Sequence, residues 1–391
     1  MQEIGWGTIF VIFVKQFLPV WIALIVTFAV SFRFRRKLGL YGKLFDSTVG
    51  MIGFGMVMFW VFTAVFADQV ALFDVLSQVS GMKNKVPGTP LPDGSGYYIF
   101  GGDHLGRDVF SRMVQGSRIV VQIAPIATLF AFMVGVTLGL PAGYYGGPLD
   151  TVLSFFANLI LAFPVILLFY LLVTPEIVET GLPQYLAVVL FLFPLIFLVV
   201  LLNSRFYVKP QFRNILIAAV LVIGGWLYLS LVSEAETRVT LLPAALDWLH
   251  VPGNILIVFV SVVFVNAPTV FRIVRGIVLD IKTRDYVAAA QTRGEGTWYT
   301  MLWEILPNAR GPLIVDFCLR IGYTTILLGT LGFFGLGLSP ESPDWGSTIN
   351  AGRKLLTVAP HPAIVPALAL MSLVLGLNLL ADGLREESLR D

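Results

Sequence analysis

Two oppositely charged residues lie within an apolar run in the last quarter of the chain. Asp316 and Arg320 stand four positions apart, so a helix places them on one face, and Tyr323 follows within one more turn. Unpaired charges are costly inside a membrane, which makes such residues candidates for function. Two uses fit this pattern. The pair neutralises itself as a structural element, or it faces a zwitterionic ligand inside the membrane.

Other kinds of chemistry lack their usual residue patterns. The three histidines are scattered without metal-ligand spacing, and the single cysteine, Cys318, excludes an internal disulfide and a cysteine zinc cluster. Paired catalytic groups and a phosphate-binding loop are absent from the sequence. A net charge of +2 with dispersed basic residues excludes nucleic acid as a partner. We therefore predict no metal site, no cofactor bound by this chain and no enzymatic activity.

The elements that must position the charged pair are membrane spans. Of 391 residues, 57% are hydrophobic and 13% are charged, whereas soluble proteins carry about 25% charged residues. A spanning helix needs about 20 mostly apolar residues. Nine runs meet this requirement, at about 9–32, 49–70, 119–141, 151–173, 183–202, 214–232, 253–271, 312–338 and 363–381. The sequence predicts an all-α multi-pass membrane protein, with the first span starting near Phe17 because Lys15 interrupts its run.

Basic residues indicate which loops face the cytoplasm. They gather in segments 33–43, 205–213 and 272–310 and at Arg385 and Arg390, and short loops rich in lysine and arginine stay cytoplasmic. These four groups are mutually consistent with nine crossings. The sequence predicts an external amino terminus, kept because no cleavable signal is evident, and a cytoplasmic carboxyl terminus.

The long segment 71–118 is then expected on the external side, where its glycines and prolines mark irregular chain. Its end, from Asp108 to Arg118, has apolar residues on one side and polar residues on the other, which indicates an interfacial helix leading into the next span. Asp108 and Arg112, four positions apart, are expected to pair on the polar face.

The cytoplasmic segment 272–310 holds two helical patterns around one glycine. A run of helix formers from Ile281 to Arg293 precedes Gly294, which permits a turn that other residues resist. The return arm has an apolar stripe at helical spacing and ends at Pro307. The stripe consists of Trp298, Met301, Leu302 and Ile305. From composition alone, a hairpin on the lipid surface and a docking site for another protein both stay open.

A resemblance to a known family favours docking. The run Tyr286-Val287-Ala288-Ala289-Ala290-Gln291-Thr292-Arg293-Gly294, followed by Leu306-Pro307-Asn308, is similar to the signature loop of permease subunits of ATP-driven importers. In that family the loop lies in a cleft of a cytoplasmic ATPase. The resemblance makes segment 272–310 an ATPase-coupling element, named here the coupling hairpin. Its expected docking residues are Asp285, Tyr286, Val287, Ala288, Ala289, Gly294, Leu306 and Pro307.

Further motifs resemble the second (C-type) permease of the dipeptide and oligopeptide (peptide/nickel) ABC importers. The external motif, residues 101–112, includes Gly106, Arg107, Asp108, Ser111 and Arg112. Other matches follow in the order that the family shows, namely Gly143-Tyr144-Tyr145-Gly146-Gly147, Leu161-Ala162-Phe163-Pro164, Phe334-Gly335-Leu336-Gly337-Leu338, Trp345-Gly346 and the run 378–385. The resemblance covers about residues 100–388, with one gap.

The chain also departs from the family pattern. Ala288 stands where the family usually has glutamate, although Asp285 lies one turn earlier; Glu304 replaces a common histidine and Leu328 a common glutamate. Family members usually have six spans, whereas this chain inserts two extra runs at about 183–250 and adds one near the amino terminus. The expected organisation is an extra span and basic segment at 1–48, a first core span at 49–70, the external loop at 71–118 and the permease core at 119–391.

The resemblance implies a type I ABC importer transmembrane domain of six core helices plus about three extra spans. It implies a permease in a bacterial inner membrane that forms half of a translocation path for peptides. The implied partners are a second permease subunit, two ATPase subunits that use ATP and Mg²⁺, and an external solute-binding protein. Nickel chelates and oligosaccharides are alternative cargoes in this family. A secondary carrier is the alternative class, but it would need acidic residues at several midplanes, where Asp316 stands almost alone.

Overall fold

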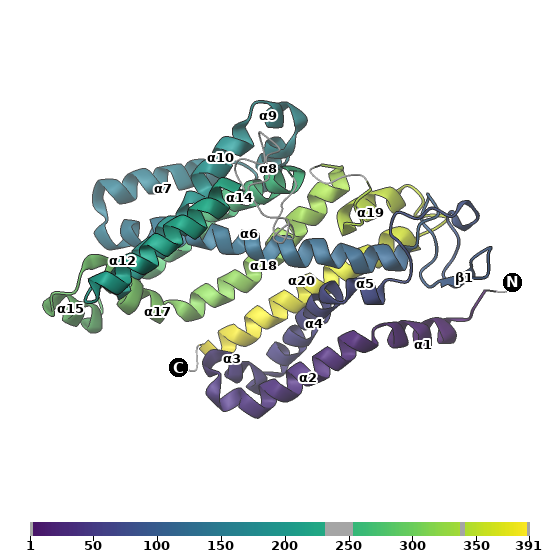
Figure 1. Cartoon of the computed structure of the whole chain (residues 1–391), viewed down its shortest axis with the longest axis horizontal. Coiled ribbons are helices and arrows are strands. Elements are labelled where there is room, and N and C mark those ends of the chain that lie inside the picture. Colours follow the sequence, from purple (N-terminus) through teal and green to yellow (C-terminus); the bar gives the residue numbers. More distant parts are fainter. Residues whose placement is uncertain (1–2, 231–252, 337–340, 389–391) are drawn as a thin grey trace. The chain divides into compact units, whose positions relative to one another are not determined.

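The structure is a computed structural model that describes residues 3–230, 253–336 and 341–388. Helices dominate these residues, and a small sheet pairs β1 (Thr89–Pro90) antiparallel with β2 (Tyr97–Tyr98) (Figure 1). The chain divides into two compact units, Met1–Pro125 with Ile314–Asp391, and Ile126–Leu313. Two long helices, α6 (Val109–Tyr145) and α18 (Arg310–Phe334), have residues in both units.

The remaining helices belong to one unit each. The first unit holds α1 (Trp6–Gln16), α2 (Leu18–Phe34), α3 (Gly39–Lys43), α4 (Thr48–Val65), α5 (Ala67–Val70), α19 (Trp345–Arg353) and α20 (His361–Ser388), with 3-10 turns at Arg35–Lys37, Leu44–Asp46 and Ser80–Met82. The second unit holds α7 (Gly147–Leu161), α8 (Val165–Val173), α9 (Pro175–Glu179), α10 (Leu182–Leu190), α11 (Leu192–Arg205), α12 (Pro210–Ala219), α14 (Gly253–Ile281), α15 (Asp285–Thr292), α16 (Thr297–Tyr299) and α17 (Leu306–Asn308), with π-helical turns at Val220–Gly224 and Thr300–Ile305.

The predicted all-α, multi-pass membrane architecture is confirmed. Eight described helices are long and apolar enough to cross a membrane: Leu18–Lys37, Thr48–Val65, Val109–Tyr145, Leu182–Arg205, Pro210–Ser230, Ile255–Ile281, Arg310–Phe334 and His361–Glu386. The first span begins at Leu18, close to the predicted Phe17, and Lys15 belongs to the separate helix α1. The last part of the predicted insertion, residues 231–250, lies outside the described residues.

The remaining predicted span, 151–173, is wrong as a single straight helix. Helix α7 ends at Leu161, α8 begins at Val165, and the two helices are bent by 82° at the break between them. Pro164 causes this break, because proline lacks a backbone N–H and restricts the residue before it to extended conformations. Hydropathy alone does not register such a break, since the flanking residues remain apolar.

Glycines bring α4 and α20 together in the first unit. A Cβ atom at Gly53 would lie 2.3 Å from the backbone nitrogen of Leu380, and one at Gly383 would lie 2.4 Å from the Cα atom of Gly50. Helices in membranes pack through such small residues, since lipid provides no hydrophobic force to drive them together. Trp60 adds a hydrogen bond from its Nε1 to Ser372 Oγ at 2.8 Å.

Glycines also allow close packing of α6 and α14 in the second unit. Gly139 and Gly143 lie one turn apart on α6, and Cβ atoms there would come within 2.9 Å of Val274 and 2.8 Å of Val278 on α14. Backbone contact at successive turns holds the two helices in one register. The end of α6 is thereby fixed beside the part of α14 that begins the coupling hairpin.

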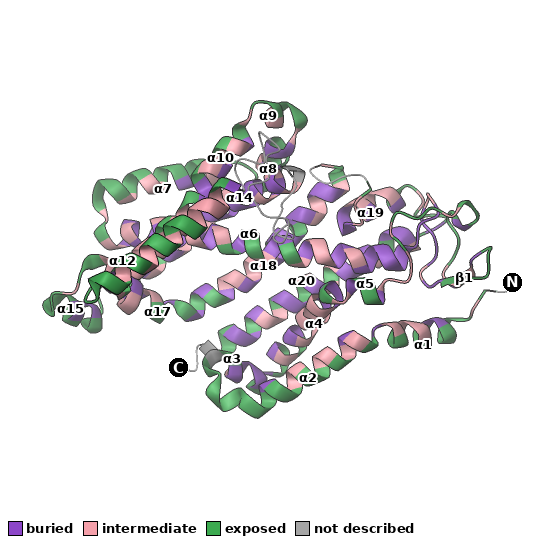
Figure 2. Cartoon of the chain, in the orientation of Figure 1, coloured by how far each residue is buried: buried purple, intermediate pink, exposed green. Residues whose placement is uncertain are grey.

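The spans predicted to be extra are the least buried within the chain. Only 11% of the apolar window of Leu18–Lys37 and 0% of that of Pro210–Ser230 are buried, against 67% for Ile255–Ile281. Exposed residues follow much of α2 and α12 in Figure 2. These helices therefore offer their surfaces to lipid or to other subunits.

Candidate functional site: the coupling hairpin and the external motif

The coupling hairpin turns at a glycine in the left-handed region. Gly294 has a φ of 78°, and a Cβ atom there would meet no other atom within 4 Å. Its N–H donates to the Gln291 carbonyl at 2.9 Å, and the N–H of Glu295 donates to the Ala290 carbonyl at 3.2 Å. These bonds end α15 in the way typical of a glycine cap. The predicted turn at Gly294 is confirmed, and the helix before it starts at Asp285, later than expected.

The hairpin has a packed side and an exposed side. Val287 and Ala290 are fully buried on α15, which packs on the π-helical turn Thr300–Ile305. That turn buries Met301, Leu302 and Ile305, which confirms most of the predicted apolar stripe. The side chains of Asp285, Tyr286, Ala288 and Ala289 are exposed, as are Gly294 and Pro307, and Leu306 is half-buried.

Val287 was predicted as a docking residue, and the structure corrects its position. Its side chain is 0% exposed, so it holds the two arms of the hairpin together and presents no surface to a partner. Sequence position did not reveal this, because Val287 lies between the exposed residues Tyr286 and Ala288.

Side-chain hydrogen bonds join the hairpin to the end of α6. Lys282 Nζ donates to the Gly143 carbonyl at 2.8 Å. Gln291 Nε2 donates to Tyr144 Oη at 2.9 Å, and Tyr145 Oη donates to Thr297 Oγ1 at 2.9 Å. The Gly-Tyr-Tyr motif, singled out earlier only by resemblance, thus contacts both arms of the hairpin. This role could not be deduced from the sequence, since more than 130 residues separate the partners.

An ion pair fixes α14 to α7 at the start of the coupling hairpin. The guanidinium of Arg275 donates to both carboxylate oxygens of Asp150, which also accepts from Ser154 Oγ at 3.0 Å. Three residues earlier, Arg272 Nη2 donates to Asn158 Oδ1 at 2.8 Å. A two-bond contact between arginine and carboxylate restricts orientation as well as distance. The basic residues Arg272 and Arg275 therefore serve the membrane part of this unit.

The inserted helices also contact the hairpin. Trp303 Nε1 donates to Ser204 Oγ at 3.0 Å, and the guanidinium carbon of Arg205 lies 4.6 Å from the centroid of the Trp303 ring. The second contact has the geometry of a cation–π interaction. On the opposite arm, Arg293 Nη2 donates to Glu304 at 2.9 Å. Glu304, where the family commonly has histidine, is thus one half of a link between the arms.

The external motif is built around a buried carboxylate. Asp103 accepts from the N–H groups of Leu105 and Arg107 at 2.8 and 2.9 Å, and from Arg107 Nε at 2.7 Å. Arg107 is only 4% exposed. Gly106 makes the intervening turn with a φ of 81°, and a Cβ there would lie 2.2 Å from the Val79 carbonyl oxygen. The charged side chains of Asp103 and Arg107 therefore bond to groups within the motif. Asp103, which accepts these bonds, was not among the site residues predicted from the sequence.

Asp108 and Ser111 connect the motif to the start of the external loop. Asp108 accepts from the Ser111 N–H at 2.9 Å and from its Oγ at 2.6 Å. Ser111 Oγ in turn accepts from the N–H groups of Leu72 and Phe73, both at 3.0 Å. Burial raises the pKa of Asp108 to about 6, against the lowering effect of the bonds from Ser111.

The predicted pair between Asp108 and Arg112 is wrong, whereas the helix predicted to lead into the next span is the first part of α6. Helix α6 begins at Val109 and continues without a break, and Arg112 is only 1% exposed. Its guanidinium donates to the carbonyls of Ser342 at 2.7 Å and of Val75 and Glu341 at 3.3 Å each. Backbone carbonyls distant in sequence, not a carboxylate one turn away, satisfy the charge.

Within the spans, Asp316 and Arg320 form the predicted pair. Arg320 Nε lies 3.2 Å from Asp316 Oδ2, and the side chains are 11% and 16% exposed, respectively. Tyr323 on the same helix is 58% exposed and is not part of this contact. The pair is thus neutral as it stands, and a structural and a cargo-facing role remain alternatives.

The sequence of this hairpin-bearing membrane chain matches a described family. Residues 135–386 match the "Binding-protein-dependent transport system inner membrane component" family. The chain belongs to this family. Its transmembrane domain is therefore that of a type I ABC importer permease, as predicted, and both the coupling hairpin and the charged pair on α18 fall within the matched residues.

Related permeases extend the match towards the amino terminus. The chain is 30% identical to the glutathione transport system permease protein GsiD of Pectobacterium atrosepticum over 292 residues, which is 75% of this chain and 72% of the relative. It is 27% identical to the dipeptide transport system permease proteins DppC of Alkalihalophilus pseudofirmus, with 81% of this chain and 80% of the relative covered, and of Haemophilus influenzae, with 86% and 88% covered. The predicted peptide/nickel family is confirmed for this inner membrane component.

Proposed function

We propose that this permease assembles with a second permease subunit, two cytoplasmic ATPase subunits and an external solute-binding protein in a bacterial inner membrane. The family description supports an inner membrane component that depends on a binding protein. The distribution of basic residues supports an external amino terminus and a cytoplasmic coupling hairpin. The chain binds no cofactor of its own, and the ATPase subunits bind ATP and Mg²⁺.

The proposed cargo is a short peptide. The relatives' names specify dipeptide and glutathione transport, and the neutral pair of Asp316 and Arg320 on α18 offers charges of both signs to the termini of a zwitterionic peptide. Competition assays would test the cargo class. Uptake of a labelled dipeptide should be reduced by unlabelled peptides and unaffected by nickel chelates or oligosaccharides. Competition by those compounds alone would reject peptides as cargo.

The coupling hairpin is the proposed mechanical link. Alternating access requires that the ATPase contact the permease differently in its two states. The single observation that carries this role is the division of α15 into an exposed face and a face buried against the return arm. An ATPase bound to the exposed face would displace the whole hairpin, because Val287 and Ala290 hold its arms together.

Displacement of the hairpin has a defined route into the membrane helices. Lys282 and Gln291 bond to the end of α6, and the glycines of α6 contact α14 directly. These contacts resist independent movement of the three elements. In this proposal Asp285 provides the charged contact that Ala288, in place of the usual glutamate, lacks.

The test is a substitution that adds bulk at the turn without a steric clash inside the chain. Gly294→Trp should reduce ATPase attachment and uptake, because the side chain projects into space that the ATPase needs and the positive φ is unfavourable to it. Gly39→Trp is the matched control, since Gly39 also has a positive φ, 54°, and open surroundings. Attachment and uptake at normal levels in the Gly294→Trp variant would contradict the coupling role.

A further inference from the structure

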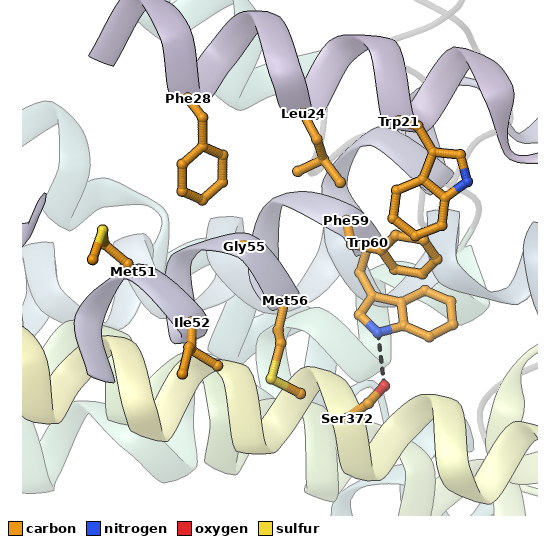
Figure 3. A pocket seen from close by; sticks show the side chains of 10 residues that line it. All are labelled: Trp21, Leu24, Phe28, Met51, Ile52, Gly55, Met56, Phe59, Trp60 and Ser372. Carbon is orange, nitrogen blue, oxygen red and sulfur yellow. Dashed lines mark hydrogen bonds between the residues drawn. The ribbon is translucent and has the colours of Figure 1, made fainter. Parts of the chain in front are cut away.

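An apolar groove runs between α2 and α4 in the first unit. Its volume is about 480 Å³, within the usual range of ligand pockets. Trp21, Leu24 and Phe28 line it from α2, and Gly55 and Phe59 from α4 (Figure 3). The hydroxyl of Ser372 also borders the groove, but it already accepts the hydrogen bond from Trp60. The groove therefore offers hydrocarbon and aromatic surface at a depth where both helices cross the membrane.

A basic turn is formed by the end of α2 and the 3-10 turn that follows it. The basic turn, Arg33–Lys37, has four cationic side chains in five residues, all exposed, and with Phe32 it encloses a hollow of about 450 Å³. Arg35 is partly engaged by Asp46, whose carboxylate lies 3.4 Å away. The turn thus retains a large positive charge at one end of the apolar groove.

Aromatic contacts fix the groove and the basic turn relative to each other. The rings of Phe28, at the end of the groove, and Phe32, beside the basic turn, both contact Phe45, with centroid distances of 5.9 and 5.2 Å. Twelve residues of helix separate Trp21 from Arg33, a rise of about 18 Å. One leaflet contributes about 15 Å to the hydrocarbon core. The distance from the far end of the groove to the cations therefore matches the depth of one leaflet.

We propose that this groove and the basic turn together bind one anionic phospholipid. An acyl chain lies along Trp21, Leu24 and Phe28, and the headgroup phosphate lies against Arg33, Arg36 and Lys37. Charge complementarity selects the headgroup, since clustered arginines and lysines directly beyond a span attract anionic lipid. The bound lipid would connect the amino-terminal span to the core span α4. This proposal depends on membrane insertion alone and not on the nature of the cargo.

Fluorescence quenching by brominated lipids tests the proposal on the assembled transporter. The complex is placed in phosphatidylcholine nanodiscs that contain a small fraction of either brominated phosphatidylglycerol or brominated phosphatidylcholine. The signal of Trp21 is obtained as the difference between the wild type and Trp21→Phe. We expect brominated phosphatidylglycerol to quench Trp21 at much lower fractions than brominated phosphatidylcholine does.

Two variants separate the headgroup from the acyl chain. The double variant Arg33→Gln/Arg36→Gln should lower the preference for phosphatidylglycerol about 25-fold, since each nearby basic residue contributes about fivefold. Gly55→Leu should reduce quenching by both lipids, because a Cβ at this position meets only Phe28, at 3.5 Å, and the added side chain fills the groove. The matched controls, Lys209→Gln/Arg213→Gln and Gly225→Leu on the inserted spans, should leave quenching unchanged.

Two results would overturn the proposal. Equal quenching by both lipids would mean that the groove holds bulk lipid without headgroup selection. Quenching of Trp21 in the isolated chain that disappears for both lipids in the assembled complex would mean that a helix of another subunit fills the groove.

Discussion

The external motif and the coupling hairpin use similar charged residues in opposite ways. In the external motif, Arg107 and Arg112 are buried and bonded, one to a carboxylate and the other to backbone carbonyls. In the hairpin, Arg293 is more than half exposed and reaches a partly exposed glutamate. The difference shows that residue type does not set the role of a charge. The supply of buried partners does, whether they lie nearby in sequence, as Asp103 does for Arg107, or far away, as the carbonyls bonded to Arg112 do.

This contrast predicts different costs of substitution. A buried charge is held by several partners, and its removal leaves those partners unsatisfied. An exposed pair contributes about 1 kcal/mol or less, because water replaces the lost contact. The external motif should therefore respond to substitution by loss of stability, and the exposed face of the hairpin by loss of coupling.

The largest effect is expected at Arg112. Arg112→Ala should destabilise the first unit by about 3 kcal/mol or more, since three carbonyls lose a charged donor. Thermal unfolding of the purified complex, with proteolysis of loop 71–108, would measure this loss. Arg118→Ala is the control: Arg118 pairs with Asp68, which is 72% exposed, so about 1 kcal/mol or less is expected. Equal losses of stability in the two variants would contradict the proposed difference between buried and exposed arginines.

Within the hairpin, substitutions at a buried and at an exposed position should differ in the same way, one lowering stability and the other weakening ATPase attachment. Val287→Asp places a carboxylate in a fully buried site and should unfold the hairpin locally, at a cost of about 3 kcal/mol. Ala289→Asp alters the exposed face and should keep the hairpin folded while it weakens ATPase attachment. Limited proteolysis at 285–300 distinguishes the two outcomes. Cleavage of both variants at the same rate would show that α15 has no buried face.

The spans were largely predictable from the sequence, whereas the long-range contacts were not. A run of about 20 apolar residues is a local property, and eight of the nine predicted runs contain a helix long and apolar enough to cross a membrane. Arg112 looked like a residue of a polar helix face because its carbonyl partners Glu341 and Ser342 lie about 230 positions away. No local pattern contains that information. The contact between Arg205 and Trp303 could not be predicted either, because these residues are also far apart in the sequence.

The glycine turn of the hairpin was predictable because it depends on one residue. Gly294 adopts a positive φ for which glycine alone is well suited, and the apolar stripe after it follows helical spacing. The exposure of each α15 residue was not predictable, since the surface that buries Val287 is the π-helical turn Thr300–Ile305.

A smaller effect is expected from pH at the external motif. The pKa of Asp108 is raised from 3.8 to about 6 in the folded protein, so the folded state takes up a proton before the unfolded state does. Stability should rise as pH falls through about 6 and level off near 4, with a gain of about 1 to 3 kcal/mol. Asp108→Asn should abolish that part of the pH dependence of thermal stability. A gain that persists in the variant would assign the titration to another group.

The smallest effect is expected where the inserted helices contact the hairpin. A double-mutant cycle of Arg205→Gln and Trp303→Phe should give a coupling energy of about 0.5 to 1 kcal/mol, or a two- to fivefold change in uptake per ATP hydrolysed. Arg213→Gln, on the same insertion, is the control. Strictly additive effects would mean that the contact between Arg205 and Trp303 does not support the hairpin.

Cysteine cross-linking of the hairpin tests the central claim most directly. Cys318, the single cysteine of the chain, is buried, so a cysteine introduced by Ala289→Cys would be the accessible thiol. In membranes that contain the assembled transporter, Ala289→Cys should cross-link to an ATPase subunit and resist labelling by an impermeant reagent from outside, whereas the buried Val287→Cys should not cross-link. External labelling of Ala289→Cys, or an intact complex without the cross-link, would contradict the account.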